Sequence, residues 1–122
     1  MGGFADYVQE LFEGLGPVRV KRMFGGLGVW AGSFDDKGVM FALVDQEVIY
    51  LKTDEALKRE LEAEGSAPWV YSRRDGWKME TSYWRLPETA LDDPDEAVAW
   101  ARKSLAAALA KAAQKPPKRK KA

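Results

Sequence analysis

The sequence predicts an α+β domain of two layers, in which helices pack on an antiparallel sheet of about six strands in the order α-β-β-β-β-α-β-β-α. Three observations predict this class. Three segments repeat apolar residues at helical spacing, six shorter segments have strand character, and the connections between successive strands are too short for parallel crossovers. The length of 122 residues fits one domain. We expect this domain at residues 1–114, followed by a disordered basic tail at 115–122.

The N-terminal segment has the pattern of an amphipathic helix. Its polar side chains fall on one side, and its apolar residues recur at helical spacing at Phe4, Val8, Leu11, Phe12 and Leu15. This helix should end at Gly14 or Gly16, because Pro17 disfavours the helical conformation of its predecessor and glycine accepts the left-handed stop.

Four strands should follow in succession. Val18–Phe24 alternates apolar and basic residues before the turn at Gly25-Gly26, and Leu27–Trp30 makes a second short strand. The stretch Gly25–Gly28 invites comparison with phosphate-binding loops, but a strand rather than a helix follows it. We therefore interpret it as a turn or bulge.

The third strand should be central. Val39–Val44 is apolar throughout, as expected when both faces of a strand are covered. Asp45-Gln46-Glu47 then turns the chain into Val48–Leu51, which completes a hairpin. In these strands we expect core roles for Met23, Phe24 and Phe41.

Two more helices and a hairpin complete the domain. Thr53 or Asp54 can cap a helix that runs through Glu64, and Asp93 caps a long alanine-rich helix that runs to about Gln114. Between these helices lies the dipeptide Asp75-Gly76, one of the strongest short-range hairpin signals. The flanking strands are predicted at Trp69–Arg74 and Trp77–Leu86.

The composition excludes several classes of chemistry. With neither cysteine nor histidine, the chain cannot carry a disulfide, a thiol nucleophile, a histidine base or a histidine-ligated metal. The acidic pairs and clusters Asp35-Asp36, Asp45 with Glu47, and Asp92–Glu96 are explained by turns and by helix capping. We expect no catalytic residue, metal or cofactor. The longest apolar run is far too short to span a bilayer, so the default expectation is a soluble cytoplasmic protein.

The charges are distributed unevenly along a chain whose total is neutral. There are 19 basic and 19 acidic residues, but residues 115–122 contain five basic and no acidic ones, so residues 1–114 carry a net charge of −5. A tail of this kind can contact phosphates without reading sequence. A solubilising role for it is at least as consistent with its composition.

Basic residues on the predicted strands and hairpin ends are interleaved with aromatic ones, as in proteins that bind single-stranded nucleic acids. The basic residues that could contact a nucleic acid or a partner are Arg19, Lys21, Arg22, Arg73, Arg74, Lys118, Arg119, Lys120 and Lys121. The aromatic residues of the last hairpin are Trp69, Tyr71, Trp77, Tyr83 and Trp84. They can equally well cover the sheet beneath the helices, and we favour this core role.

Several strings resemble the N-terminal domain of the TfoX/Sxy family, the regulators of competence. The most specific is Arg22-Met23-Phe24-Gly25-Gly26, within the longer match Leu15–Val29. The likeness continues, in order and spacing, through Met40–Val44, Ile49–Asp54, Pro68–Tyr71, Met79–Pro87, Asp92-Asp93-Pro94 and Trp100. It covers roughly residues 4–112.

The resemblance implies a helix-sheet-helix domain and a non-enzymatic regulatory role. Named members promote transcription of DNA-uptake genes together with a cyclic-AMP receptor-type activator, so a protein partner from the transcription machinery is expected. The full-length regulators carry a second, helical domain, whereas only the basic tail follows the long helix here. The family offers no catalytic residue that could be carried over to this chain.

Three alternatives remain open at this level. The chain could bind nucleic acid directly through its tail and sheet arginines, or it could be a small-molecule-binding or enzymatic domain with an aromatic pocket around Trp69, Trp77 and Trp84. Self-association into a homodimer is also open, because a six-stranded sheet retains edges and an alanine-faced helix can pack closely against a copy.

Overall fold

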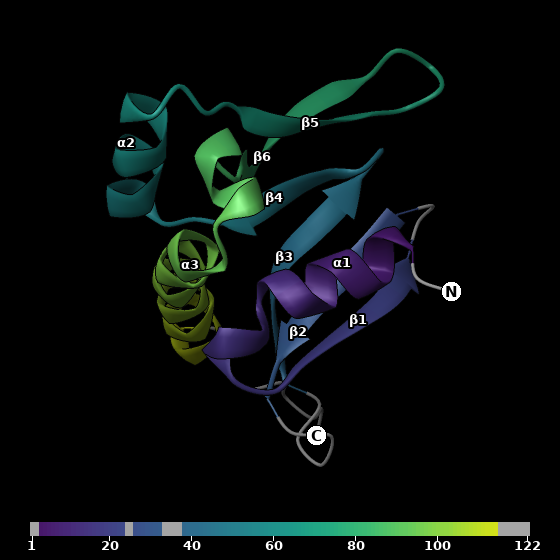
Figure 1. Ribbon diagram of the computed structural model, residues 1–122. Coiled ribbons are helices and arrows are strands. Elements are labelled where there is room, and N and C mark those ends of the chain that lie inside the picture. Colours follow the sequence, from purple (N-terminus) through teal and green to yellow (C-terminus); the bar gives the residue numbers. More distant parts are fainter. Residues whose placement is uncertain (1–2, 24–25, 33–37, 115–122) are drawn as a thin grey trace, which may run out of the picture.

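The computed structural model describes residues 3–23, 26–32 and 38–114 and has the predicted order of elements (Figure 1). The helices are α1 (Phe4–Leu11), α2 (Glu55–Ala63) and α3 (Pro94–Gln114), with short 3₁₀ helices at Glu13–Leu15 and Glu88–Asp92. The strands are β1 (Val18–Met23), β2 (Gly26–Ala31), β3 (Val39–Asp45), β4 (Val48–Lys52), β5 (Pro68–Ser72) and β6 (Lys78–Arg85). None of the described helices combines the length and apolar character needed to cross a membrane.

The six strands form one antiparallel sheet in the order β1-β2-β3-β4-β6-β5. β3 and β4 lie in the middle, which confirms the prediction of a central strand at residues 39–44. Their two-residue turn places Gln46 and Glu47 at φ values of 52° and 64°. Positive φ at both positions matches the right-handed twist of the flanking strands, which is why tight hairpins adopt this turn.

Two predicted boundaries are wrong by a few residues. The first helix ends at Leu11 rather than at a glycine, because its last turn tightens into the 3₁₀ helix before Gly16. The last hairpin has a longer turn than predicted, since β5 ends at Ser72 and β6 begins at Lys78. Within this turn the Asp75 carboxylate accepts a hydrogen bond from the Trp77 N–H at 3.0 Å.

The predicted helix caps are confirmed. The Asp54 carboxylate accepts the Leu57 N–H at 2.8 Å, and Asp93 accepts the N–H groups of Asp95 and Glu96 at 3.1 and 3.2 Å. These side chains satisfy amide donors that have no partner inside the helix. The starts of α2 and α3 are therefore specified locally.

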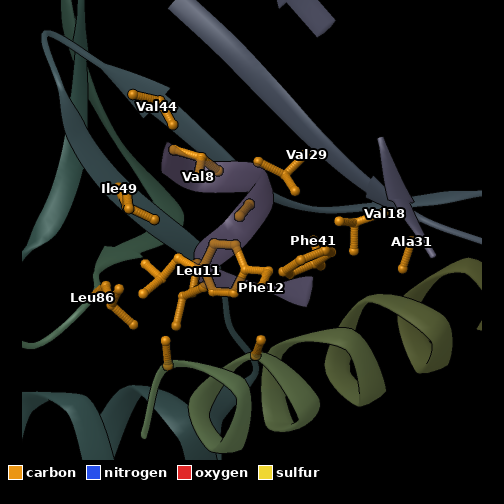
Figure 2. Packing of buried hydrophobic residues seen from close by; sticks show 14 of the residues in the cluster. Val8, Leu11, Phe12, Val18, Val29, Ala31, Phe41, Val44, Ile49 and Leu86 are labelled. Atoms are coloured by element: carbon orange, nitrogen blue, oxygen red, sulfur yellow. The ribbon is translucent and has the colours of Figure 1, made fainter. Parts of the chain in front are cut away.

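The hydrophobic core lies between the sheet and the helices α1 and α3 (Figure 2). At its centre the rings of Phe12 and Phe41 meet edge to face, with centroids 5.5 Å apart, and both side chains are fully buried. The predicted core role of Phe41 is confirmed. The prediction for Met23 is wrong, because this half-buried side chain lies on the other face of the sheet, and Phe24 lies outside the described residues.

A bulge in β3 lies at the point where α3 is hydrogen-bonded to the sheet. Val29 pairs with Ala42, but its neighbour Trp30 pairs with Met40, so β3 has one extra residue at this point. The hydroxyl of Ser104, in α3, lies 2.8 Å from the carbonyl oxygen of Phe41 and 2.7 Å from that of Lys52. Ser104 is fully buried, so its hydroxyl joins the helix to two neighbouring strands.

Replacing Ser104 by alanine should lower the free energy of unfolding by about 1–3 kcal/mol, because two carbonyl groups would lose a buried donor. Urea unfolding measures this loss. The control is Ser66→Ala, which removes an exposed hydrogen bond of 2.7 Å to the Arg85 carbonyl. Equal losses for the two variants would contradict the role assigned to Ser104.

Candidate interaction surface

The helices α1 and α3 pack on one face of the sheet, and no described helix covers the other face (Figure 1). Strand residues that alternate with core positions project from this uncovered face, which we call the open face. Its side chains come from five strands and from β5 at the edge. They are Arg19, Lys21, Met23, Trp30, Met40, Leu43, Asp45, Tyr50, Arg85 and Trp69.

Gly28 allows two large side chains to lie flat on the open face. A Cβ atom at this position would come within 2.6 Å of the Trp30 ring and 2.7 Å of the Met23 sulfur. The ammonium group of Lys21 lies 5.6 Å from the centroid of the Trp30 ring, close enough for a cation–π contact. The glycine thus creates a platform of one indole, one thioether and one cation.

A row of four aromatic rings crosses the open face toward the β5 edge. Ring centroids are 6.2 Å apart for Tyr50 and Trp69, 6.0 Å for Trp69 and Tyr71, and 6.4 Å for Tyr71 and Trp77. The indole N–H of Trp69 donates to the Asp45 carboxylate at 3.1 Å, which holds this ring across the strands between them. We call these four residues the aromatic row.

The outer part of the β5–β6 hairpin, residues 70–80, forms an arm that projects beyond the rest of the sheet (Figure 1). Every residue of this arm is exposed. Its large apolar side chains are exposed by 43% at Val70, 43% at Tyr71, 46% at Trp77 and 47% at Met79. The prediction that the hairpin aromatics cover the sheet beneath the helices is therefore wrong for Tyr71 and Trp77, because no described helix reaches the arm. It is also wrong for Trp69 and Tyr83, which lie on the face away from the helices.

Charged groups organise the tip of the arm. The guanidinium of Arg73 lies 4.8 Å from the Trp77 ring centroid and forms an ion pair of 2.8 Å with Asp75. The hydrogen bond from Arg73, followed by that from the Trp77 N–H, lowers the pKa of the Asp75 carboxyl below 3.8. Asp75 is thus ionised at neutral pH and holds Arg73 over the indole.

Tyr50 and Tyr83 are neutral at physiological pH. Burial raises the pKa of the Tyr83 phenol above 10.0, and burial followed by the Asp45 charge raises that of Tyr50. The ammonium of Lys52 lies 5.2 Å from the Tyr83 ring. Positive charge on this side of the molecule therefore comes from lysine and arginine over neutral rings.

Those of the predicted contact residues that the structure describes lie in different parts of it and do not form one site. Arg19 and Lys21 project from the open face, but Arg22 points to the opposite face, near Phe4. Arg73 and Arg74 lie in the arm at the far edge of the sheet, roughly 24 Å from β1 at the usual spacing of strands. The remaining predicted contacts, Lys118, Arg119, Lys120 and Lys121, lie outside the described residues.

The predicted aromatic pocket around three tryptophans is wrong. Trp69 belongs to the aromatic row and Trp77 lies in the arm, whereas Trp84 pairs with Leu51 and shares its helix-covered face. The sequence interpretation also omitted Trp30 and Tyr50. The alternation of β4 could have placed Tyr50, because its neighbours Ile49 and Leu51 are both buried.

The predicted acidic pairs and clusters include residues with structural partners. Asp45 binds the Trp69 indole and Asp93 caps α3, as described above. Within residues 3–23, 26–32 and 38–114, no group of three or more possible ligands could hold a metal ion. Asp35 and Asp36 lie outside the described residues.

Comparison with known proteins identifies a family. The family model described as the TfoX N-terminal domain matches residues 10–108 of the chain. A search of the curated proteins finds no match.

The two strand glycines should respond differently to alanine. At Gly26 a Cβ would lie 2.1 Å from the backbone oxygen of Val44, whereas at Gly28 it would meet the ends of two side chains that can move. Overpacking usually costs about 1–3 kcal/mol. Gly26→Ala should therefore lose more free energy of unfolding than Gly28→Ala, and Gly28→Ala should expose the Trp30 indole. Urea unfolding and tryptophan emission measure these effects, and no emission change in Gly28→Ala would contradict the platform.

Proposed function

Because the chain belongs to the TfoX N-terminal domain family, we propose that it is a non-enzymatic regulatory domain that acts by binding another protein in the control of transcription. The resemblance to competence regulators points to a cyclic-AMP receptor-type activator or its polymerase as the partner, and to genes of DNA uptake as the target. We place the contact on the open face.

The observation that carries this proposal is an aromatic and basic sheet face that no described helix covers. Tryptophan, tyrosine and arginine are the residues that contribute most to binding energy at protein interfaces. The open face presents Trp30, Tyr50, Trp69 and Arg85 on strands of a packed sheet. Such side chains are held in place before binding, so little conformational entropy is lost when a partner docks.

The charge of the open face indicates the character of the partner. Arg19, Lys21 and Arg85 project from it, and the single acidic group among its side chains, Asp45, is occupied by the Trp69 indole. An acidic partner surface would be complementary and would speed association.

Reversing one charge on the open face should weaken partner binding. Lys21→Glu should raise the Kd for the purified activator or polymerase at least about tenfold, equivalent to about 1.4 kcal/mol, because it opposes an acidic surface. Arg102→Glu, at an exposed position on α3, makes the same charge change away from the open face and should leave the Kd unchanged. Biolayer interferometry measures both.

Two outcomes would contradict this proposal. Equal changes of the Kd in Lys21→Glu and Arg102→Glu would show that the partner does not bind at the open face. Turnover of generic ester, phosphate or nucleotide substrates at enzyme-like rates, by the purified chain, would contradict a non-enzymatic role.

A second candidate function is direct binding of single-stranded nucleic acid, which the aromatic row favours. Its successive ring centroids are 6.0 to 6.4 Å apart, and the Arg73 guanidinium lies over the last ring. Bases stack on such rings without regard to sequence, while cations nearby neutralise phosphates. The basic tail would add contacts that depend on charge alone.

Deleting residues 115–122 should flatten the salt dependence of nucleic-acid binding. Each phosphate contact adds about 0.9 to the slope of log K against log salt on duplex DNA and about 0.7 on single strands. Trp77→Ala should instead weaken binding to single strands at every salt concentration with little change in slope, because it removes stacking. Fluorescence anisotropy measures both variants. Absence of binding at low salt would rule out this second function.

A further inference from the structure

Large apolar side chains of the arm are exposed to solvent. It has only two strands, and such a hairpin is marginally stable in water unless another layer or strand supports it. Of the five exposed large apolar side chains in the described part of the chain, four belong to this arm: Val70, Tyr71, Trp77 and Met79. Concentrated apolar exposure of this kind marks an interaction site.

The arm also contains one of the two edges of the sheet. β5 has a single neighbour, β6, and the chain before it continues along the same edge, because Arg85 N–H donates to the Ala67 carbonyl at 3.0 Å. Natural edges are usually blunted by charges, prolines or bulges. The outer strand β5 (Pro68–Ser72) carries no charged residue; its proline and its register irregularity, between Pro68 and Val70, lie at its N-terminal end.

The opposite edge, β1, is protected by charge. It carries Arg19, Lys21 and Arg22, and the Gln9 amide donates to the Val18 carbonyl at 2.7 Å. Pairing of two β1 strands would bring like charges together, which is destabilising. A second copy of the chain therefore meets electrostatic repulsion at β1 and none at β5.

We propose that two copies of this chain associate by antiparallel pairing of their β5 strands about a two-fold axis at Val70, which joins the two sheets into one. In this register Trp69 of each copy lies directly opposite Tyr71 of the other. Two aromatic cross-strand pairs result, which are among the most favourable pairs in antiparallel sheets. The two aromatic rows then meet at the axis.

The same register is complementary in charge. Arg74, exposed at the arm tip, falls opposite Ser66 of the second copy, two residues from Glu64 at the C-terminal end of α2. Glu62 and Glu64 are both exposed. Each tip thus brings an arginine to an acidic helix end, where the negative end of the helix dipole adds to the attraction.

The mass of the purified chain in solution tests this pairing without any other partner, so its result is independent of the proposed function. Light scattering after gel filtration should give twice the chain mass of 13.6 kDa for the wild type. Val70→Lys should shift this to the mass of one chain, because it places two ammonium groups at the axis. Leu109→Lys, at a residue of α3 that is 49% exposed, is the matched control and should remain a dimer.

A cysteine substitution keeps the test decisive if Val70→Lys impairs folding. The chain has no cysteine of its own, and directly opposed residues in antiparallel strands have Cα atoms about 4.5–5.5 Å apart, within the range a disulfide spans. Val70→Cys should therefore oxidise to a disulfide-linked dimer on a non-reducing denaturing gel, whereas Leu109→Cys should form no disulfide link and run as a single chain on that gel. A wild type with a mass of 13.6 kDa at every concentration would overturn the proposal. A dimer that only Leu109→Lys dissociates would also overturn it. So would a dimer that Val70→Lys does not dissociate and Val70→Cys does not cross-link.

Discussion

The arrangement of this protein depends on how a six-stranded sheet is covered. A sheet has two faces, and the described helices pack on only one of them. The long helix α3 is held there by the buried Ser104 hydroxyl, which reaches the carbonyl groups of Phe41 and Lys52, and by apolar contacts around Phe12. All side chains that project the other way must meet solvent or a partner. The character of the open face follows from this one-sided packing.

The open face is stable in water because its large side chains cover one another. Trp30 and Met23 lie over Gly28, and Trp69 reaches across to Asp45, so that Leu43 beneath is only 8% exposed. Cations over the rings of Trp30, Tyr83 and Trp77 keep this surface polar at its outer layer.

Charge separates between the two sides of the molecule as well as along the chain. The N-terminal helix and its 3₁₀ turn carry Asp6, Glu10 and Glu13 with no basic residue, and α2 ends in a run that contains Glu60, Glu62 and Glu64. The open face is basic. The open face is thus more basic than α1 and the end of α2, whereas the neutral total of the chain also depends on the five basic residues of 115–122.

The sequence by itself determined the order of elements, the central strand, the helix caps and the family, because each depends on short-range signals: periodicity, turn residues and a few consecutive strings. Ser104 and Trp30 carried no such signal, since their roles depend on residues far along the chain. The tertiary structure alone decided that the tryptophans do not converge and that the arm is uncovered. The physical reason is that exposure depends on where helices dock. A hairpin of alternating aromatics has the same sequence whether or not a helix reaches it.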